Sequence, residues 1–186
     1  MPSTECQTKK TKKRMKMRTG KNIAGLVDMI KYISAFSDTS KMLIAEIGVF
    51  MGAATVIFAK HFKTVFAVDP WDWDHMNVAN SDPNTVYSAF VHKTYNTRNI
   101  KCVRLTSEKA ILKAPNAIDV VYIDANHNYE QVRQDIKLWL PKIVRGGFIC
   151  GHDYYTKFPG VIQAVNEKFV KPDKVFQDTS WIVRIK

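Results

Sequence analysis

Two short blocks of this sequence carry side chains that can move a proton or hold a cation. In the first, Asp124 and His127 stand three residues apart after an apolar run, in a D-x-x-H pattern. In the second, His152 and Asp153 follow another apolar run. A neutral imidazole, with a pKa of about 6.5, can take a proton from a hydroxyl group at cellular pH. His127 is therefore the candidate general base, with Asp124 beside it in the catalytic site.

The same blocks offer ligands for a divalent cation. Carboxylate oxygens suit Mg²⁺, whereas an imidazole nitrogen suits Mn²⁺ or Fe²⁺ better. The candidate metal ligands are Asp124, Asp153 and His152. A bound cation would lower the pKa of a substrate hydroxyl group and orient it. Structural interpretations stay open, because either aspartate could cap a loop and either histidine could be a solvated or packed residue.

A glycine turn earlier in the chain has the composition of a nucleotide-binding site. The run AEIGVFMGAAT, residues 45–55, passes from an apolar segment through Gly48 and Gly52 into a helix-like stretch. Glycine lets the backbone approach a ligand, and a helix start offers free N–H groups. Asp69 follows 23 residues after Glu46, where a carboxylate can accept hydrogen bonds from ribose hydroxyls. These features predict one half of a nucleoside-binding α/β domain.

The residue between the glycines separates two classes of cofactor. A dinucleotide fold usually carries a glycine where this sequence has Phe50, because a pyrophosphate lies against the turn. A phenylalanine there would obstruct a pyrophosphate but not the amino-acid end of S-adenosylmethionine. This favours S-adenosylmethionine over a nicotinamide cofactor. An ordinary tight turn between a strand and a helix is the structural alternative. The residues expected to bind the cofactor here are Glu46, Gly48, Phe50 and Gly52.

Strand-like and helix-like segments alternate along the chain. Strands are expected at 42–47, 64–69, 100–105, 119–124 and 148–151, and helices at 22–36, 53–62, 84–96, from 107, from 128 to a break at Pro141, and at 160–170. Gly146 and Gly147 are expected to separate a helix from the strand after it. The runs KVFQD and WIVRIK suit an antiparallel hairpin. This order predicts a Rossmann-like, doubly wound α/β fold with a mostly parallel seven-stranded sheet, helices on both faces and a C-terminal hairpin.

Glycines and polar residues follow the carboxyl ends of the expected strands. Ligands bind beyond these ends in parallel α/β sheets. Scattered surface acids would not be expected to fall there so regularly. The residues that this edge of the sheet brings together are Glu46, Gly48, Asp69, Ser107, Asp124 and Asp153.

The segment Tyr122–Tyr155 resembles the small-molecule O-methyltransferase branch of the class I S-adenosylmethionine-dependent methyltransferases. The shared pattern is I-D-x-x-H-x-Y-x-x-V-x-x-D, then a Gly-Gly turn, then H-D-Y. The E-x-G-x-x-x-G turn resembles motif I of the same class. The resemblance spans roughly Leu43 to Trp181. It implies a methyltransferase that acts on a hydroxyl group of a small molecule, of the sugar or natural-product type, with S-adenosylmethionine and with assistance from Mg²⁺ or another divalent cation.

Catechol O-methyltransferase is similar more distantly and implies where the cofactor lies. Its ribose-binding acid falls on Asp69, and its adenine-contacting segment falls on Thr106, Ser107 and Glu108. The aromatic loop after Asp69 is expected to form one side of the adenine site or, equally, to cover the edge of the sheet. Its residues are Trp71, Trp73, His75 and Met76. Trp71 is included among the expected cofactor-binding residues.

The same comparison implies roles in the reaction. The two metal-binding aspartates of catechol O-methyltransferase fall on Asp124 and Asp153, and its general-base lysine falls on His127. Asp124 then serves both the cofactor and the metal. The third metal ligand, an asparagine, falls on Tyr154, so this sequence departs from the pattern there. A histidine is a reasonable substitute for the lysine, since it can accept a proton at neutral pH.

The positive charge of the chain is concentrated at its N-terminus. The net charge is +11 over 186 residues, and residues 1–21 hold eight basic side chains and one acidic one. We interpret 1–21 as a basic, disordered tail and 22–186 as the methyltransferase domain. Residues 9–18 could form an arm for nucleic acid, but a solubilising terminus is favoured. The expected partner is a small hydroxylated acceptor, and a homo-oligomer is left open.

Cysteine usage and hydropathy indicate a cytoplasmic protein. Three cysteines occur without a C-x-x-C pair, and Cys102 and Cys150 lie in strand-like runs as expected buried thiols. No apolar stretch approaches the roughly 20 residues of a membrane span, and no apolar signal region opens the sequence. Two other functions stay open: a nucleic-acid-directed methyltransferase guided by the tail, and a non-catalytic nucleotide-binding module. The sequence after Asp124 lacks an N-P-P-Y motif, which disfavours the first.

Overall fold

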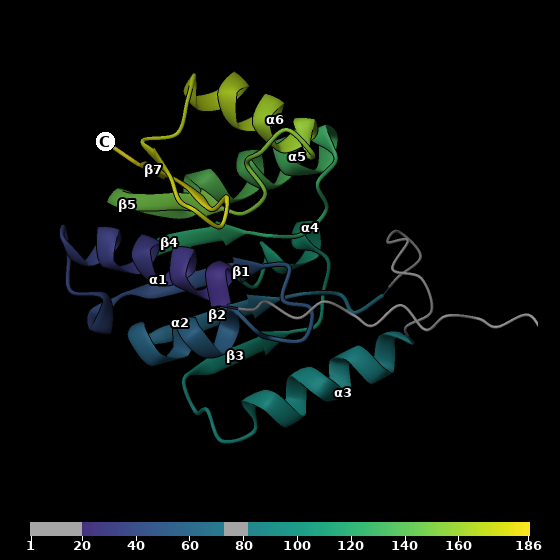
Figure 1. Ribbon diagram of the computed structural model, residues 1–186. Helices are drawn as coiled ribbons and strands as arrows, with labels where there is room; N and C mark the ends of the chain where they lie inside the picture. The colour runs from purple at the N-terminus through teal and green to yellow at the C-terminus, as the bar shows by residue number, and fades with distance from the viewer. Residues whose placement is uncertain (1–19, 73–81) are drawn as a thin grey trace, which may run out of the picture.

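The computed structural model describes residues 20–72 and 82–186, and within them seven strands form one sheet (Figure 1). The strands are β1 (Leu43–Ile47), β2 (Thr64–Val68), β3 (Ile100–Val103), β4 (Ile118–Ile123), β5 (Ile143–Gly151), β6 (Lys174–Val175) and β7 (Trp181–Arg184). Their order across the sheet is β3-β2-β1-β4-β5-β7-β6. Strand β7 is antiparallel to β5 and β6, and the other neighbouring pairs are parallel. The predicted doubly wound fold and its C-terminal hairpin are confirmed.

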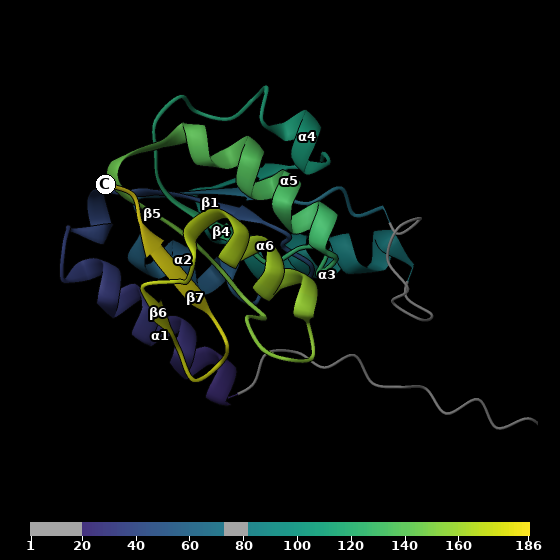
Figure 2. The same cartoon turned by 90° about the horizontal axis from the view of Figure 1, so that it is seen from above.

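Helices cover both faces of the sheet. The helices are α1 (Gly20–Ser34), α2 (Thr55–His61), α3 (Pro83–Thr94), α4 (Ser107–Ala110), α5 (Tyr129–Trp139) and α6 (Pro159–Phe169), with short 3-10 turns η1 (Thr39–Lys41) and η2 (Leu140–Lys142). Figure 2 shows α1 and α2 on one side of the strands and α4, α5 and α6 on the other. Side chains of α3 join the core on the α1 side. The site can therefore form only at the strand ends, because both faces are occupied.

Successive side chains along each strand point to opposite faces of the sheet, so the protein has one hydrophobic core on each face. In β1, Ile44 packs with Phe58 of α2, whereas Ala45 and Ile47 point to the other face and share a core with Trp139 of α5. A strand covered on both faces is mostly apolar, and the buried Glu46 is the exception in β1. Each large side chain buried in this way contributes about 1.5–3 kcal/mol. The two cores fix the strand ends rigidly.

The helix before β5 ends earlier than the glycine pair. Pro141 cannot donate a backbone hydrogen bond, and α5 gives way to η2 at Leu140. Strand β5 then begins at Ile143, so Gly146 and Gly147 lie inside it, and the prediction that they end the helix is wrong. Gly147 is needed there because a Cβ atom would stand 2.6 Å from the backbone oxygen of Asp119. A register shift between β4 and β5 falls in the same region.

The two cysteines of the sheet differ in exposure. Cys150 is buried in β5, as predicted, and burial raises the pKa of its thiol. Cys102 is exposed, so the prediction of a buried thiol is wrong for that residue. The reason is topological, since β3 is the edge strand of the sheet. Within the described ranges, none of the helices combines the length and the apolar character that a membrane span requires.

Candidate functional site

The register of the parallel strands brings their ends to one edge of the sheet. Ile47, the last residue of β1, pairs with Val68 of β2 and with Ile123 of β4, and Ile123 pairs with Gly151 of β5. Backbone hydrogen bonds continue past these residues, from Gly48 N–H to Val68, from Asp124 N–H to Ile47 and from His152 N–H to Ile123. The turns after the four strands are therefore direct neighbours.

Gly48 allows the turn after β1 to pass against the turn after β4. Its φ is +89°, and a Cβ atom would stand 2.3 Å from the backbone oxygen of Asp124. No side chain fits at that distance, and the left-handed conformation also favours glycine. The first glycine of the turn is thus required by the approach of two protein segments, in addition to any approach to a ligand.

Asp69 organises the turn between β1 and α2. One carboxylate oxygen accepts hydrogen bonds from the backbone N–H groups of Val49 and Phe50, both at 2.9 Å, and the other accepts from Trp71 N–H at 2.7 Å. Phe50 and Trp71 both have positive φ, 54° and 45°. The indole N–H of Trp71 also donates to the Phe50 carbonyl at 2.8 Å. A single carboxylate therefore holds two residues in an unfavourable backbone conformation.

A cavity of about 310 Å³ opens at this edge of the sheet. Small-molecule sites span about 300–1,000 Å³. The lining residues come from the turns after β1 to β4 and from α4 and α5: Ile47, Gly48, Phe50, Val68, Asp69, Pro70, Asp72, Thr106, Ser107, Glu108, Asp124, Ala125, Asn126, Gln131 and Asp135. The expected cofactor residues that border it are Gly48, Phe50, Asp69, Thr106, Ser107 and Asp124.

The other expected cofactor residues lie behind this lining. Glu46 is within β1 and is 1% exposed. Gly52 faces the ring of Phe90, 2.8 Å from where its Cβ atom would lie. Trp71 is buried between Tyr87 and Phe90, with ring centroids at 4.9 Å in both cases. These residues support the turn from outside, and their direct contact with a cofactor stays a prediction. Trp73, His75 and Met76 lie outside the described residues, as do residues 9–18 of the basic tail.

His127 and Asp153 form a close pair beside the cavity. Nε2 of His127 lies 2.7 Å from Oδ2 of Asp153, and the imidazole ring stacks on Phe158 at a centroid distance of 4.3 Å. Gly160 lets α6 approach this loop, because a Cβ atom on it would stand 2.7 Å from the His127 backbone oxygen. Asp153 itself has a positive φ of 61°. The ring of His127 is thus fixed by packing on one side and by a carboxylate on another.

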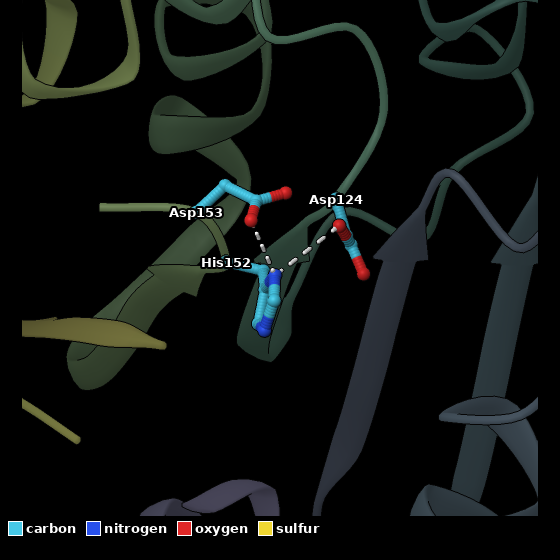
Figure 3. Close-up of side chains that lie close together, drawn as sticks. All are labelled: Asp124, His152 and Asp153. Carbon is cyan, nitrogen blue, oxygen red and sulfur yellow. Dashed lines mark ion pairs between the residues drawn. The ribbon is translucent and has the colours of Figure 1, made fainter. Parts of the chain in front are cut away.

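His152 lies between two carboxylates, as Figure 3 shows. Its Nδ1 atom is 3.1 Å from Oδ1 of Asp153 and 4.0 Å from Oδ1 of Asp124. Burial alone would raise the pKa of Asp153, but hydrogen bonds from His127 and His152 outweigh it and hold that pKa below its usual range. On its other side, His152 Nε2 lies 3.9 Å from Oδ2 of the buried Asp178.

The predicted metal ligands converge in space. One ligand atom from each of Asp124, His152 and Asp153 lies within 4.8 Å of the others. Two carboxylate oxygens and one imidazole nitrogen suit Mn²⁺ or Fe²⁺, so this donor set fits a divalent cation. Tyr154 points elsewhere, since its hydroxyl group donates to Asn166 of α6 at 2.8 Å. The departure from the asparagine of catechol O-methyltransferase is thus a tyrosine turned away from the cluster.

Asp135, the last aspartate of the pattern I-D-x-x-H-x-Y-x-x-V-x-x-D, borders the cavity, although no role in the site was predicted for it. It lies on the face of α5 that carries Val132, Ile136 and Trp139, and it is completely buried. Burial raises its pKa to about 6, and Glu108 adds to the rise. A charged residue in register with the apolar stripe of a helix is the sequence signal that could have revealed it.

The strand order and the cavity beyond the strand ends are those of a Rossmann-like α/β protein with a ligand site at the edge of its sheet. Residues 45–154 match the family model described as a methyltransferase domain, and the chain belongs to this family. The matched segment begins in β1 and ends after β5, so it contains the turns of the site. An uncharacterised protein of Acanthamoeba polyphaga mimivirus is 30% identical over 132 residues, which is 66% of this chain. The alignment covers 57% of that relative, so the chain spans little more than half of its length.

Solved structures share this fold at low sequence identity. The O-methyltransferase NovP gives a TM-score of 0.65 with 16% identity, covering 87% of this chain and 79% of that chain. The TDP-rhamnose 3′-O-methyltransferase of calicheamicin biosynthesis gives 0.60 with 14% identity and coverages of 87% and 79%. Protein SMU.1697c of Streptococcus mutans, solved with S-adenosylhomocysteine, gives 0.59 with 13% identity and coverages of 86% and 96%. These likenesses concern the fold.

Proposed function

We propose that this protein is an S-adenosylmethionine-dependent O-methyltransferase acting on a hydroxyl group of a small molecule. The main support for the proposal is that one loop, residues 124–126, separates the large cavity from a small pocket. Asp124, Ala125 and Asn126 border the large cavity on one side, and on the other they border a small pocket beside His127 and His152. A cofactor in the cavity would present its reactive group to the histidines across this loop.

The cofactor roles follow from the lining. Asp69 keeps acceptor capacity after its three backbone hydrogen bonds, since a carboxylate can accept about four. It could therefore accept one from a ribose hydroxyl group. Phe50 borders the turn where a dinucleotide would place its pyrophosphate. The complex of SMU.1697c with S-adenosylhomocysteine supports the same cofactor class for this fold.

His127 would act as the general base. Its Nε2 atom faces Asp153, so the hydrogen-bond pattern assigns the proton to Nε2 and leaves the lone pair on Nδ1. In the reaction the acceptor oxygen attacks the methyl carbon in line with the sulfonium sulfur. The carbon–sulfur bond breaks, S-adenosylhomocysteine leaves, and the hydroxyl proton passes to Nδ1. Asp153 fixes the ring and stabilises the imidazolium that forms.

Asp124, His152 and Asp153 would hold a divalent cation. When bound, such an ion would lower the pKa of the acceptor hydroxyl group and orient it. His127 remains outside this set and keeps its contact with Asp153.

The acceptor is proposed to be a sugar or a natural product. NovP and the TDP-rhamnose enzyme, which share this fold, are O-methyltransferases, and this supports oxygen as the methylated atom. Phe158 and Tyr155, whose ring centroids lie 5.3 Å apart, give the region beside His127 an aromatic border. We also propose that the methyltransferase domain begins with α1, at Gly20 rather than at residue 22, that the basic segment before it is a tail, and that the protein works in a reducing cytoplasm.

The test is a methyl-transfer assay with labelled S-adenosylmethionine over a panel of hydroxylated acceptors, including sugar nucleotides and phenols. Each acceptor is assayed with Mg²⁺, with Mn²⁺ and with EDTA. Label that appears as a methyl ether on a small acceptor supports the proposal. Label transferred only to nucleic acid, with loss of transfer after residues 1–21 are removed, would replace it with the nucleic-acid-directed alternative.

A further inference from the structure

Asp135 is a buried carboxylate that the reaction described above does not use. It is 0% exposed, and neither of its oxygens has a hydrogen-bond partner within the described part of the chain. Buried polar groups are nearly always hydrogen-bonded, and an unsatisfied carboxylate is costly. A donor supplied by a ligand would remove this cost.

Two polar neighbours of Asp135 form hydrogen bonds with other groups, and each keeps one donor hydrogen that those bonds do not use. The hydroxyl oxygen of Ser107 accepts a hydrogen bond from the Trp139 indole at 2.8 Å, and the Gln131 amide donates to Glu108 at 3.3 Å. Ser107 and Gln131 lie near enough to oppose the rise in the pKa of Asp135, yet outside hydrogen-bonding geometry with it. The wall formed by α4 and α5 thus contributes two acidic residues, Glu108 and Asp135, to the lining of the cavity, and the oxygens of Asp135 have no hydrogen-bond donor among the described residues.

The position of this wall indicates which part of a cofactor meets it. The sulfonium methyl group must face His127, so the sulfur lies near the loop that the cavity shares with the small pocket. Ser107, Glu108, Gln131 and Asp135 border the large cavity but not that pocket. The adenine ring of the cofactor, which is joined to the sulfur through the ribose, is therefore the part that reaches the wall formed by α4 and α5.

We propose that Asp135 accepts a hydrogen bond from the exocyclic amino group of adenine and makes the site selective for adenine over a deaminated base. This rests on the proposed cofactor. Hypoxanthine carries an oxygen in place of the amino group, so two acceptors would face each other. A site that pairs a polar group of its ligand rejects an analogue lacking it, because the buried partner stays unpaired.

The experiment compares the affinities of S-adenosylhomocysteine and S-inosylhomocysteine by calorimetry. The wild-type protein is expected to prefer the adenine compound by roughly 10-fold to 100-fold. Asp135→Asn keeps the shape and adds an amide donor, so the ratio of the two affinities should fall about tenfold or more. Asp119→Asn is the matched control, since Asp119 accepts from Leu43 N–H at 2.7 Å and does not border the cavity.

A purely structural role would change both affinities together. An unchanged ratio in Asp135→Asn, with both ligands bound, would overturn the proposal and leave the cofactor assignment intact. Absence of binding by either compound to the wild-type protein would overturn the cofactor assignment itself, and the proposal with it. Asp135→Ser, which is smaller and neutral, provides a second variant and should also lower the ratio.

Discussion

Nε2 of His127 lies 2.7 Å from Oδ2 of Asp153, on a ring that also stacks against Phe158. The two residues come from the turns after different strands, and the parallel register of β4 and β5 brings them together. A base must be held within reach of the proton it takes, and its tautomer must be fixed. The contact with Asp153 fixes the tautomer of His127. The pair also lies beside the cavity in which the methyl donor would bind.

Replacement of His127 tests the pair directly. His127→Ala should lower kcat by roughly 10²–10⁴-fold because the acceptor proton loses its base. The affinity for S-adenosylhomocysteine should stay near that of the wild type, since His127 does not border the large cavity. His92→Ala, which changes an exposed histidine of α3, is the control. A variant with wild-type turnover would remove His127 from the role of base.

Loss of the Asp69 carboxylate should weaken both the turn and cofactor binding. Asp69→Ala leaves three N–H groups without their acceptor, and each such buried group costs about 1–3 kcal/mol. We expect a lower melting temperature and a weaker affinity for S-adenosylhomocysteine, measured by thermal unfolding and calorimetry. A destabilised variant that binds the cofactor as tightly as the wild type would show that Asp69 only supports the turn.

Two glycines with positive φ separate a steric effect from a conformational one. Gly48→Ala places a Cβ atom 2.3 Å from the Asp124 backbone oxygen, whereas Gly146→Ala, at φ +83°, meets nothing within 4 Å. A left-handed alanine costs about 1–2 kcal/mol, and overpacking adds about 1–3 kcal/mol. Urea denaturation should therefore show the larger loss for Gly48→Ala. Equal losses of stability would mean that the turn after β1 and the turn after β4 are not packed tightly against each other.

Asp135 should give the stability a dependence on pH. Its pKa rises from 3.8 to about 6 on folding, so the folded state holds this proton more tightly than the unfolded state. The resulting stabilisation is fully present below the unfolded pKa and is lost as the pH rises through about 6. It amounts to roughly 3 kcal/mol. The Asp135→Asn variant has no such titrating group. Its free energy of unfolding in urea, relative to that of the wild type, should therefore rise between pH 4 and pH 7. A constant difference between the two proteins would contradict the burial argument.

A divalent cation should bind at the carboxylates around His152. Titration with Mn²⁺, followed by electron paramagnetic resonance, should show one site in the wild type. Asp124→Asn should weaken it by about 10–100-fold, an order typical of altered metal shells. Asp38→Asn, at an exposed turn beside η1, is the control. Equal affinity in the two variants would show that the cluster is an ion-pair network and no metal site.

The strand ends of this fold were predictable because each is marked by a local pattern. An apolar run followed by Gly48, Asp69 or Asp124 is visible in the sequence, and parallel sheets collect such ends at one edge. The strand order was not visible in the same way. Cys102 is exposed because β3 lies at the edge of the sheet, and hydropathy along the strand cannot reveal that.

Side-chain direction was harder to predict than position. Glu46 lies in β1 and Trp71 in the turn after β2, and both side chains are buried. Asp69 was expected to bind the ribose, which stays a prediction, and the structure adds that its carboxylate accepts three backbone hydrogen bonds, from Val49, Phe50 and Trp71. Asp135 closes the shared sequence pattern but was given no role, because charged helix residues usually face solvent. These outcomes depend on contacts between distant segments, which no local spacing encodes.

The large cavity beyond the strand ends is expected to bind S-adenosylmethionine, and calorimetric titration with S-adenosylhomocysteine measures that binding. Binding of one equivalent at micromolar affinity, together with no response to NAD, is the predicted result. Binding of NAD in its place would contradict the argument from Phe50 and the cofactor assignment. A flat titration with both ligands would contradict the methyltransferase account and favour a module that keeps the fold without the reaction.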